Sequence, residues 1–395
     1  MQPLAFLFLL LTAIIDCFWL RALWVIWWGV RRWPFAKIAK NTDKPTSEES
    51  PKIAVFIPAR NEQERVEKAL SSVLAQDYPN FSVRFIDDQS TDKTWEIASR
   101  LARGCNRLEL FRGKSRPEGW LGKPWALHQI TQGVTEDWFL FVDADVVLHP
   151  QALSRAMDEA ERYGSDLLSI LVTVRLQSFW QKVIGLTTAA IVAVTSPIAY
   201  VNDPKKKTAF AAGGFMLFRR DAYQAVGGHA AVKDQIVEDV ALAYKVKKRN
   251  LRLVLLSAPE LVSTHFFGGF NEIWRNLRKN FFGLFGVHPG KLSLYSLWLL
   301  MWVLLPWFGL VAGISFSIRF ESSIEWRAVA AFSFIGVASL LGMTGVFALL
   351  ARSSPLYALT VPLGVCVLLA ISWSNAWMFY FGSGLEWKGR TVAMK

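Results

Sequence analysis

Apolar runs at both ends of the chain enclose a middle part in which apolar and polar positions alternate. From Pro3 to Val30 almost every residue is apolar, and further apolar runs extend over 294–316, 328–350 and 356–381. Each run is close to the roughly 20 residues that a helix needs to cross a bilayer. The pattern therefore predicts a first membrane crossing, a central domain and three further crossings.

In the middle part, apolar strands alternate with amphipathic helices. Residues 52–57, 82–86 and 138–142 are typical of buried strands, and helical patterns follow the first two. Strand and helix in alternation predict a mostly parallel sheet, so the expected fold class is α/β with added transmembrane helices. The first helix is expected to be capped by Asn61 or Glu62, and the second to begin at Ser90 or Thr91.

Carboxylates follow two of these strands. Asp87 and Asp88 come after the second strand, and Asp143 and Asp145 come after the third. The carboxyl ends of parallel strands meet at the edge where such sheets bind ligands. If the chain stays extended, Asp143 and Asp145 point the same way and can face one hard cation. The alternative is a solvated turn, since Asp is common where a chain reverses.

Five further residues, at three places in the chain, are candidates for binding or catalysis, and each place also has a purely structural alternative. Glu238 and Asp239 precede a helical pattern, where acidic side chains also simply favour the first turn. Lys123 precedes a helix and can meet a phosphate oxygen, or it is solvated. Gly213 and Gly214 come before an apolar strand and either admit a ligand close to the backbone or form a plain bend.

Several enzyme classes lose support. No Gly-rich phosphate loop follows the first strand, so dinucleotide-dependent and P-loop enzymes are disfavoured. No His or Cys cluster has the spacing of a zinc site, and there is no Gly-x-Ser-x-Gly elbow. The three cysteines, Cys17, Cys105 and Cys366, are dispersed and predict no disulfide framework.

The ordered motifs resemble those of a known family. Residues 57–62 (IPARNE), 87–94 (DDQSTDKT), 143–145 (DAD) and 238–239 (ED) are similar to the inverting family 2 glycosyltransferases of the GT-A fold, over roughly residues 50 to 285. Residues 119–123, 211–215 and 386–390 narrow the resemblance to a membrane-bound branch. That branch includes hopanoid-associated, carotenoid and ceramide glycosyltransferases.

The resemblance implies a role for each matching residue. Asp88, with Asp87 beside it, would bind the uracil or ribose of a UDP-sugar. Asp143 and Asp145 would hold Mg²⁺ or Mn²⁺ on the diphosphate, which stabilises the leaving UDP. Asp239, next to Glu238, would take the proton of the acceptor hydroxyl during one inverting displacement. The remaining substrate-binding candidates are Pro58, Arg60, Glu62, Lys123, Asp143, Gly213, Gly214, Arg275 and Arg278.

The two arginines belong to a pattern that is altered here. Processive and many ceramide-type members of the family carry a Gln or Arg, two further residues, and then Arg-Trp. Here Arg275 and Arg278 match this motif, but Lys279 stands in the position of the Trp. Arginines can still bind a diphosphate bidentately. The alternative is a basic interfacial helix with its aromatic side chains toward lipid.

Composition and charge add a membrane partner. Of 395 residues 52% are hydrophobic, 18 are Trp, and the net charge is +12. The basic residues cluster around expected interface segments, which favours anionic lipid headgroups over nucleic acid. Arg31, Arg32, Lys37 and Lys40 follow the first apolar run and place its carboxyl end in the cytoplasm. Asp16 and Arg21 interrupt this run and are expected to pair or to face protein.

The expected organisation has five parts. These are an anchor (1–33), a linker (34–51), a catalytic domain (52–290), transmembrane helices (291–382) and a tail (383–395). Interfacial helices are expected at about 178–200 and 270–286, although the first could instead be a buried helix of the catalytic domain. Four crossings leave the basic tail outside, against the positive-inside trend, unless the run around Pro306 is re-entrant.

These observations predict a metal-dependent enzyme of the inner (plasma) membrane with its catalytic domain in the cytoplasm. It would transfer one hexose from a UDP-hexose, UDP-glucose first, to the hydroxyl of an isoprenoid, sphingoid or glycerolipid. The expected partners are the UDP-hexose, the lipid acceptor and the anionic bilayer. Two alternatives stay open, a processive polysaccharide synthase and a non-catalytic membrane scaffold.

Overall fold

The computed structural model describes residues 2–38, 50–195, 198–265, 268–285, 288–320, 324–381, 385–387 and 390–392. It divides into two compact units. The α/β unit comprises Arg32–Arg175 and Ile198–His265, and the helical unit comprises Met1–Arg31, Leu176–Pro197 and Phe266–Lys395. The chain therefore passes between the units several times.

A seven-stranded sheet forms the centre of the α/β unit, with the strand order β3-β2-β1-β4-β8-β6-β9. Only β8 runs against its neighbours β4 and β6, so the sheet is mostly parallel, as expected. Its strands are β1 (Ile53–Ala59), β2 (Phe81–Asp87), β3 (Leu108–Arg112), β4 (Trp138–Val142), β6 (Leu167–Leu171), β8 (Phe215–Arg219) and β9 (Leu253–Ser257).

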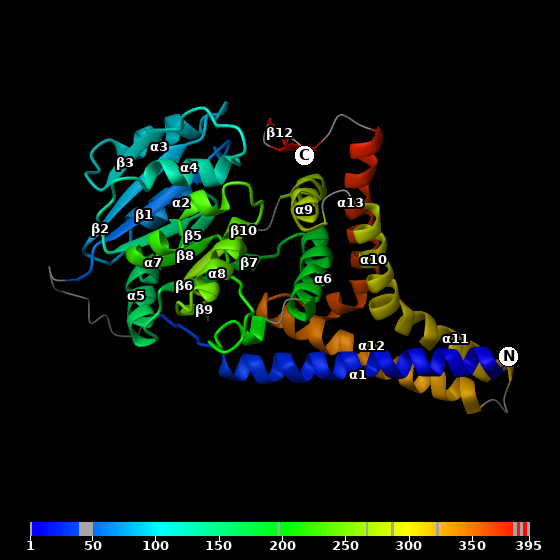
Figure 1. Ribbon diagram of the computed structural model, residues 1–395. Coiled ribbons are helices and arrows are strands. Elements are labelled where there is room, and N and C mark those ends of the chain that lie inside the picture. The colour runs from blue at the N-terminus through cyan, green and yellow to red at the C-terminus, as the bar shows by residue number, and fades with distance from the viewer. Residues whose placement is uncertain are drawn as a thin grey trace. The chain divides into compact units, whose positions relative to one another are not determined.

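Helices cover both faces of this sheet, giving three layers (Figure 1). In β1, the side chains of Val55 and Ile57 enter one core cluster and those of Ala54 and Phe56 enter the other, because successive strand residues point to opposite faces. The first face carries α2 (Val66–Leu74), α3 (Thr94–Ala102) and α5 (Ala152–Arg162). The second carries α4 (Gly122–Ile130), α7 (Arg220–Ala225) and α8 (Glu238–Lys248).

A smaller sheet joins β5 (Val146–Leu148), β10 (Val262–His265) and β7 (Thr173–Arg175). In it, β10 pairs antiparallel with β5 and parallel with β7. Strand β5 follows β4 after the turn at 143–145, so this sheet begins where the acidic end of β4 lies. Short 3-10 helices η1 (Ile198–Tyr200) and η2 (His229–Val232) complete the unit.

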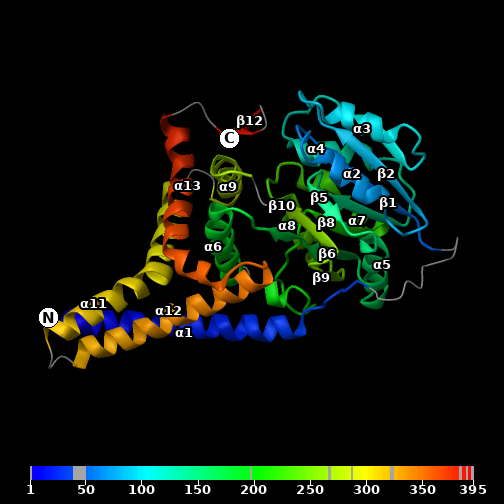
Figure 2. The same ribbon diagram turned by 180° about the vertical axis from the view of Figure 1, so that it is seen from behind.

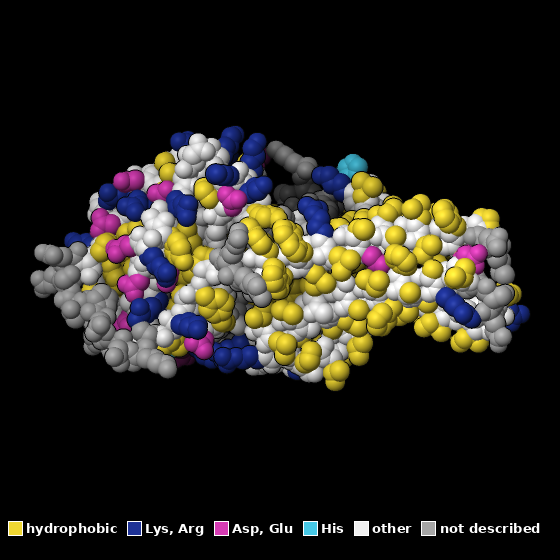
Figure 3. All heavy atoms as spheres, turned by 90° about the horizontal axis from the view of Figure 1, so that it is seen from below, with side chains coloured by type: hydrophobic (Ala, Val, Ile, Leu, Met, Phe, Trp, Pro, Cys, Tyr) yellow, Lys and Arg dark blue, Asp and Glu magenta, His cyan; other side chains and the backbone are white. Residues whose placement is uncertain are grey.

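The helical unit consists of long apolar helices, and Figure 3 shows hydrophobic side chains over most of its surface seen from below. Its elements are α1 (Gln2–Arg32), α6 (Phe179–Thr195), α9 (Phe270–Phe285), α10 (Pro289–Leu299), η3 (Leu300–Leu304), α11 (Leu305–Arg319), α12 (Ile324–Leu350), η4 (Pro355–Thr360), α13 (Val361–Phe381), β11 (Leu385–Trp387) and β12 (Arg390–Val392).

Four helical segments in the described part of the chain are long and apolar enough to cross a membrane: Pro3–Trp28, Pro289–Arg319, Ile324–Leu350 and Pro355–Met378. Their number and positions agree with the four apolar runs of the sequence. The chain is therefore a membrane-associated protein with an α/β domain and transmembrane helices.

The second of these segments is interrupted near Pro306. Five residues form the π-helical turn η3, and the helix axis bends between α10 and α11 (Figures 1 and 2). Pro306 has no N–H to donate to the carbonyl of Trp302, four residues earlier. The indole Nε1 of Trp19 in α1 donates to that carbonyl instead, at 2.8 Å. This contact fixes α1 against the bend.

Asp16 lies buried within the helical unit. Its side chain is 5% exposed, and neither carboxyl oxygen has a hydrogen-bond partner among the described residues, while Arg21 is exposed. The expected pair of Asp16 with Arg21 is therefore wrong, and the alternative that Asp16 faces protein holds. Gly336 on α12 allows this approach, because a Cβ there would lie 2.8 Å from Asp16 Oδ1.

Two expected boundaries differ from the structure. Residues 34–38, expected in a linker, add to the edge of the large sheet, where Ala36 N donates to Ser257 O at 3.1 Å and Phe35 bridges Ser257. The rest of the expected linker, residues 39–49, lies outside the described residues. Helices α6 and α9 were expected in the catalytic domain but belong to the helical unit, where both pack with the membrane helix α13. The alternative of α6 as a buried helix of the catalytic domain is therefore wrong.

Candidate active site

Most of the predicted site residues lie at one edge of the large sheet. Strands β1, β2 and β4 end there, and the antiparallel strand β8 begins there. This edge therefore brings together the ends of three parallel strands, the start of β8, and the loops that lead into α4 and α8. The residues so placed are Pro58, Arg60, Glu62, Asp87, Asp88, Lys123, Asp143, Asp145, Gly213, Gly214, Glu238 and Asp239.

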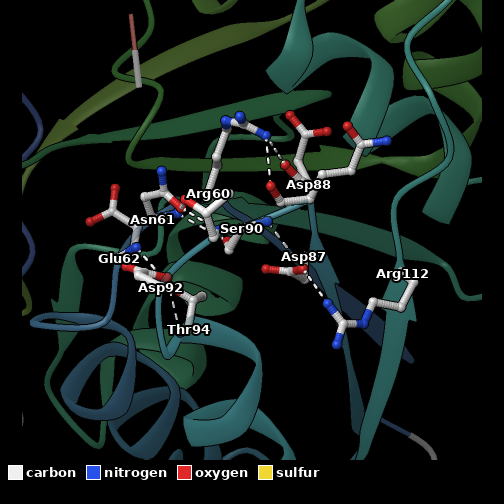
Figure 4. A network of polar contacts seen from close by, with 11 residues as sticks. Arg60, Asn61, Glu62, Asp87, Asp88, Ser90, Asp92, Thr94 and Arg112 are labelled. Atoms are coloured by element: carbon white, nitrogen blue, oxygen red, sulfur yellow. Dashed lines mark hydrogen bonds and ion pairs between the residues drawn. The ribbon is translucent and has the colours of Figure 1, made fainter. Parts of the chain in front are cut away.

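The loop after β1 is tied to the loop after β2 (Figure 4). Arg60 Nη1 donates to the carbonyls of Asp88 and Gln89, at 2.6 and 2.9 Å. Asn61 has φ +51 and its side-chain oxygen accepts from Thr91 N at 2.9 Å. Two side chains of one loop therefore fix the backbone of the other, and Arg60 supports the site through carbonyls.

The helix starts near these loops differ from the expected ones. Helix α2 begins at Val66, several residues after Asn61 and Glu62, and α3 begins at Thr94 rather than near Ser90. Glu62 N donates to Thr94 Oγ1 at 2.8 Å, and that hydroxyl donates to Asp92 Oδ1 at 2.5 Å. The polar residues thus bond between loops before either helix starts.

Asp87 and Asp88 are both buried at the end of β2. Asp87 Oδ2 forms a 3.0 Å ion pair with Arg112 Nη1, and the guanidinium of Arg112 lies 3.8 Å from the ring centre of Trp95. Asp87 Oδ1 has no partner among the described residues. Sequence reasoning missed Arg112, because it stands at the end of β3 in no recognisable motif.

Lys123 connects two acidic parts of the site. Its Nζ lies 2.7 Å from Asp143 Oδ1 and 2.6 Å from Glu238 Oε1. Burial alone would lower the pKa of Lys123, but the carboxylates Asp143, Glu238 and Asp239 outweigh it and raise that pKa well above its usual value. Lys123 is therefore a fixed positive charge, and the alternative of a solvated lysine is wrong.

Asp239 is held by the backbone at the start of α8. Its Oδ2 accepts from Gly213 N and its Oδ1 accepts from Val240 N, both at 2.8 Å. Burial and the neighbouring charge of Glu238 raise the pKa of Asp239 to about 6, against the lowering influence of Lys123 and the two N–H donors. Such a carboxylate can accept a proton near neutral pH.

Gly213 and Gly214 are needed for close packing at this point. A Cβ on Gly213 would lie 2.9 Å from Asp239 Oδ2 and 3.2 Å from Lys123 Nζ. A Cβ on Gly214 would lie 2.7 Å from Val172 Cγ2. The glycine pair is therefore more than a bend, since it lets the backbone reach the carboxylate of Asp239.

Asp143 and Asp145 lie on a turn and not on an extended strand. Strand β4 ends at Val142, and Val146 N donates to Asp143 O at 3.1 Å. The extended chain on which the expected orientation of the two side chains rested is therefore absent. Among the described residues no group of three or more His, Cys, Asp or Glu converges to hold a metal ion by protein ligands alone.

The donor set still fits a magnesium or manganese ion that is shared with a substrate. Such an ion commonly takes one or two carboxylates and completes its shell with phosphate oxygens and water. Asp143 has a partly exposed carboxylate, and Lys123 already supplies a cation beside it. A site completed by a diphosphate is consistent with these residues.

Arg275 and Arg278 belong to α9 in the helical unit, where Arg275 is exposed and Arg278 is half-buried. Burial lowers the pKa of Arg278 from its usual value. The role of both arginines as diphosphate ligands stays a prediction. The side chain of Lys279 lies outside the described residues.

Comparisons with known proteins place this geometry in context. Residues 54–227 match the family described as Glycosyl transferase family 2. A relative named 4,4'-diaponeurosporenoate glycosyltransferase, from Staphylococcus aureus (strain USA300), is 26% identical over 288 residues, or 70% of this chain and 72% of the relative. The same-named protein of the bovine strain RF122 / ET3-1 is 26% identical over 254 residues, or 62% of this chain and 65% of that relative.

One solved structure resembles most of the chain. It is the mannosyltransferase PcManGT from Pyrobaculum calidifontis in complex with GDP-Man and Mn²⁺, with a TM-score of 0.53 at 16% identity. The match covers 94% of this chain and 99% of that one. This likeness concerns the fold.

Proposed function

The chain belongs to glycosyl transferase family 2 and combines a GT-A domain with transmembrane helices, and from this premise we propose that it transfers a single hexose from a UDP-hexose to a membrane lipid. UDP-glucose is the first donor to test, and the proposed acceptor is the hydroxyl of an isoprenoid, sphingoid or glycerolipid. The relative named for 4,4'-diaponeurosporenoate favours a carotenoid-like lipid among these.

The observation that carries the proposal is the arrangement of Lys123, Asp143, Glu238 and Asp239. A fixed ammonium joins two carboxylates, and a third carboxylate with a pKa of about 6 lies beside it. A positive charge at this position stabilises the negative charge that develops on a departing diphosphate. A raised carboxylate pKa suits a group that removes a proton.

In the proposed mechanism, the buried Asp88 and its neighbour Asp87 accept hydrogen bonds from the base or ribose of the donor. Arg60 keeps their loop in place, and Pro58 and Glu62 belong to the same wall of the nucleotide site. Lys123 meets the diphosphate. A divalent ion held by Asp143 and Asp145 would supply further charge stabilisation to the leaving group.

Asp239 then takes the proton of the acceptor hydroxyl while that oxygen attacks the anomeric carbon. The C–O bond to the diphosphate breaks as the new glycosidic bond forms, so one displacement inverts the anomeric centre. Gly213 and Gly214, which let the backbone approach Asp239 closely, are proposed to contact the sugar or the acceptor. Glu238 stays paired with Lys123 and so ties the start of α8 to α4. Arg275 and Arg278 remain proposed diphosphate ligands.

The relative's name gives a second acceptor class, because 4,4'-diaponeurosporenoate is named as a carboxylate. A carboxylate acceptor is already deprotonated near neutral pH, so its glycosylation to an ester would not need Asp239 as a base. The two acceptor classes therefore differ in how strongly they depend on Asp239.

The test uses the purified full chain in nanodiscs made with membrane lipid extract. UDP release and hexose addition to lipids are measured by mass spectrometry, with UDP-glucose, UDP-galactose, UDP-N-acetylglucosamine and GDP-mannose offered in turn, with Mg²⁺ or Mn²⁺. We expect one hexose per lipid, lost in Asp239→Asn, and loss of metal-dependent UDP binding in Asp145→Ala.

Other outcomes have definite meanings. Polymer in place of a singly glycosylated lipid would contradict the proposal and favour a processive synthase. Unchanged turnover in Asp239→Asn with a lipid alcohol would remove Asp239 from the mechanism. If Asp239→Asn loses turnover with lipid alcohols but retains it with lipid acids, the result would support a carboxylate acceptor.

A further inference from the structure

Lysines from two separate segments of the α/β unit meet at the end of α8. The Nζ of Lys247 donates to the carbonyl of Asp203 at 2.8 Å and to that of Lys206 at 3.5 Å. This anchors the loop that carries Lys205, Lys206 and Lys207 to the last turn of α8, next to Lys248. We name Lys205, Lys206, Lys207, Lys247 and Lys248 the lysine patch.

The loop of the patch is fixed by its own hydrogen bonds. Asn202 donates from Nδ2 to Leu255 O at 2.9 Å and accepts at Oδ1 from Leu255 N at 2.6 Å. Asp203 Oδ1 accepts from Lys205 N at 2.9 Å, which closes the turn. Three consecutive lysines are thus held at one place on the surface.

The four exposed lysines of the patch, Lys205, Lys206, Lys207 and Lys248, have no ion-pair partner among the described residues. Asp203 is the nearest acid in the loop, and its Oδ1 already accepts from a backbone N–H. A cluster of like charges without a counter-charge costs stability through repulsion. A ligand with several negative charges would relieve that cost.

The chain that supports the patch directly follows a candidate membrane span, which points to lipid headgroups as the source of the negative charges. Trp33, the first residue after α1, donates from Nε1 to Leu255 O at 2.7 Å, the same residue that Asn202 holds. The chain also re-enters the unit at Ile198, which packs with Trp33 in one core cluster. A candidate membrane span, Pro3–Trp28, therefore ends five residues before Trp33, which supports the loop of the patch.

Exposed aromatic side chains lie on α8 and on the segment after Trp33 that supports the patch. Phe35, two residues after Trp33, is 49% exposed, and Tyr244, one helical turn before Lys248 on α8, is 55% exposed. Aromatic rings next to basic side chains are typical of protein surfaces at the headgroup level of a bilayer.

We propose that the lysine patch binds the phosphate groups of anionic membrane lipids and thereby seats the α/β unit on the bilayer. The patch is formed by the turn at 202–208 and the end of α8, and the same helix begins with Glu238 and Asp239. An eleven-residue α-helix is about 16 Å long and rigid. Binding of lipid at one end of α8 therefore sets the distance of Asp239 from the headgroups.

The first test does not depend on glycosyl transfer. The full chain is placed in nanodiscs of phosphatidylcholine alone or with about 30% phosphatidylglycerol, and exposed lysines are acylated briefly and quantified by mass spectrometry. We expect acylation of Lys205, Lys206, Lys207 and Lys248 to slow at least about threefold with the anionic lipid, and this protection to disappear at about 0.5 M salt. Lys52 and Lys68, exposed elsewhere on the unit, are the internal controls.

Equal acylation of the patch in both nanodiscs would overturn the proposal. Equal slowing at Lys52 and Lys68 would do the same, because it would show a general effect of the anionic surface on the reagent. Protection by free inorganic phosphate in phosphatidylcholine nanodiscs, as strong as that by phosphatidylglycerol, would assign the patch to a soluble anion and also contradict the proposal.

A second test compares two variants with the same loss of charge. In K205Q/K206Q/K207Q the difference in Lys248 acylation between the two nanodiscs should fall below about half of its wild-type size, whereas K52Q/K68Q/R103Q should keep it. Thermal unfolding of both variants controls for folding. If UDP release is observed, its rate should depend less on phosphatidylglycerol in K205Q/K206Q/K207Q than in the wild type, and K52Q/K68Q/R103Q should behave like the wild type. If no UDP release is observed at all, the acylation result still decides the lysine patch, while the proposed function fails.

Discussion

At the scale of single residues, Lys123 carries the most information about the site. Its neighbours in sequence give no reason to prefer a phosphate ligand over a solvated side chain. In the folded chain its ammonium lies within 2.7 Å of both Asp143 and Glu238. These carboxylates are separated by about a hundred residues, so only folding determines which charges the lysine meets.

The first prediction concerns the pH dependence of hexose transfer to a lipid alcohol. Only the deprotonated form of Asp239 can take a proton, and burial together with Glu238 raises its pKa to about 6. We therefore expect the rate of UDP release to rise about tenfold per pH unit below pH 6 and to level off above it. A rate that stays constant between pH 4.5 and 7 would contradict Asp239 as the base.

The second prediction extends the first to Lys123→Met. The charge of Lys123 lowers the pKa of Asp239, so its removal should move the midpoint of the pH profile to higher pH. The maximal rate should also fall, because the diphosphate loses a positive partner. An unshifted midpoint would show that Lys123 does not act on Asp239. Lys68→Met, at an exposed position of α2, serves as the control.

The third prediction concerns Gly213→Ala. The added Cβ would lie 2.9 Å from Asp239 Oδ2, so Asp239 or the backbone must move. A displacement of about 1 Å at a reacting group can cost about 100-fold in rate, and we expect a loss of this order in kcat/KM. Gly342→Ala is the matched control, because nothing lies within 4 Å of its added Cβ. Equal activity of the two variants would contradict the close approach.

At the scale of secondary-structure elements, the bend between α10 and α11 depends on a contact from α1. Trp19→Phe keeps an aromatic ring but removes the donor to Trp302 O. We expect a loss of about 1–3 kcal/mol in the free energy of unfolding, measured as a lower thermal midpoint in detergent micelles. Trp24→Phe, at a site that is 57% exposed on the same helix, should leave the midpoint unchanged.

Element boundaries were the least predictable part of the fold. Apolar periodicity identifies α2 and α3, but Asn61 and Ser90, which look like caps in the sequence, bond across to the neighbouring loop instead of starting a helix. Asn61 N donates to Ser90 Oγ at 3.0 Å. A polar side chain takes whichever donor folding brings near, and that donor is 29 residues away in sequence.

At the scale of the whole molecule, the four candidate spans predict a topology. If α1 ends in the cytoplasm, α11 ends outside and α12 returns the chain to the cytoplasm. Single cysteines in a cysteine-free background at Arg319→Cys and Ser353→Cys should then react with an impermeant thiol reagent from opposite sides of sealed vesicles. Reaction from the same side would mean that α12 does not cross the bilayer.

Local sequence patterns were enough to predict the α/β class, the four apolar spans and the acidic residues at the strand ends. These features follow from local periodicity and from motif order, both of which are properties of neighbouring residues. The sequence also carried the resemblance that the family match confirmed. The sequence placed Asp143 and Asp145 at a strand end but did not predict their turn geometry.

The contacts between groups that are distant in sequence could be seen only in the folded chain. The pairing of Lys123 with Glu238, the support of Asp87 by Arg112, and the grouping of α6 and α9 with the membrane helices all join segments far apart in the chain. Their energies depend on distance and burial in three dimensions, and neither quantity is encoded in local spacing. For the same physical reason, the lysine patch emerges only when the loop after Asn202 meets the end of α8.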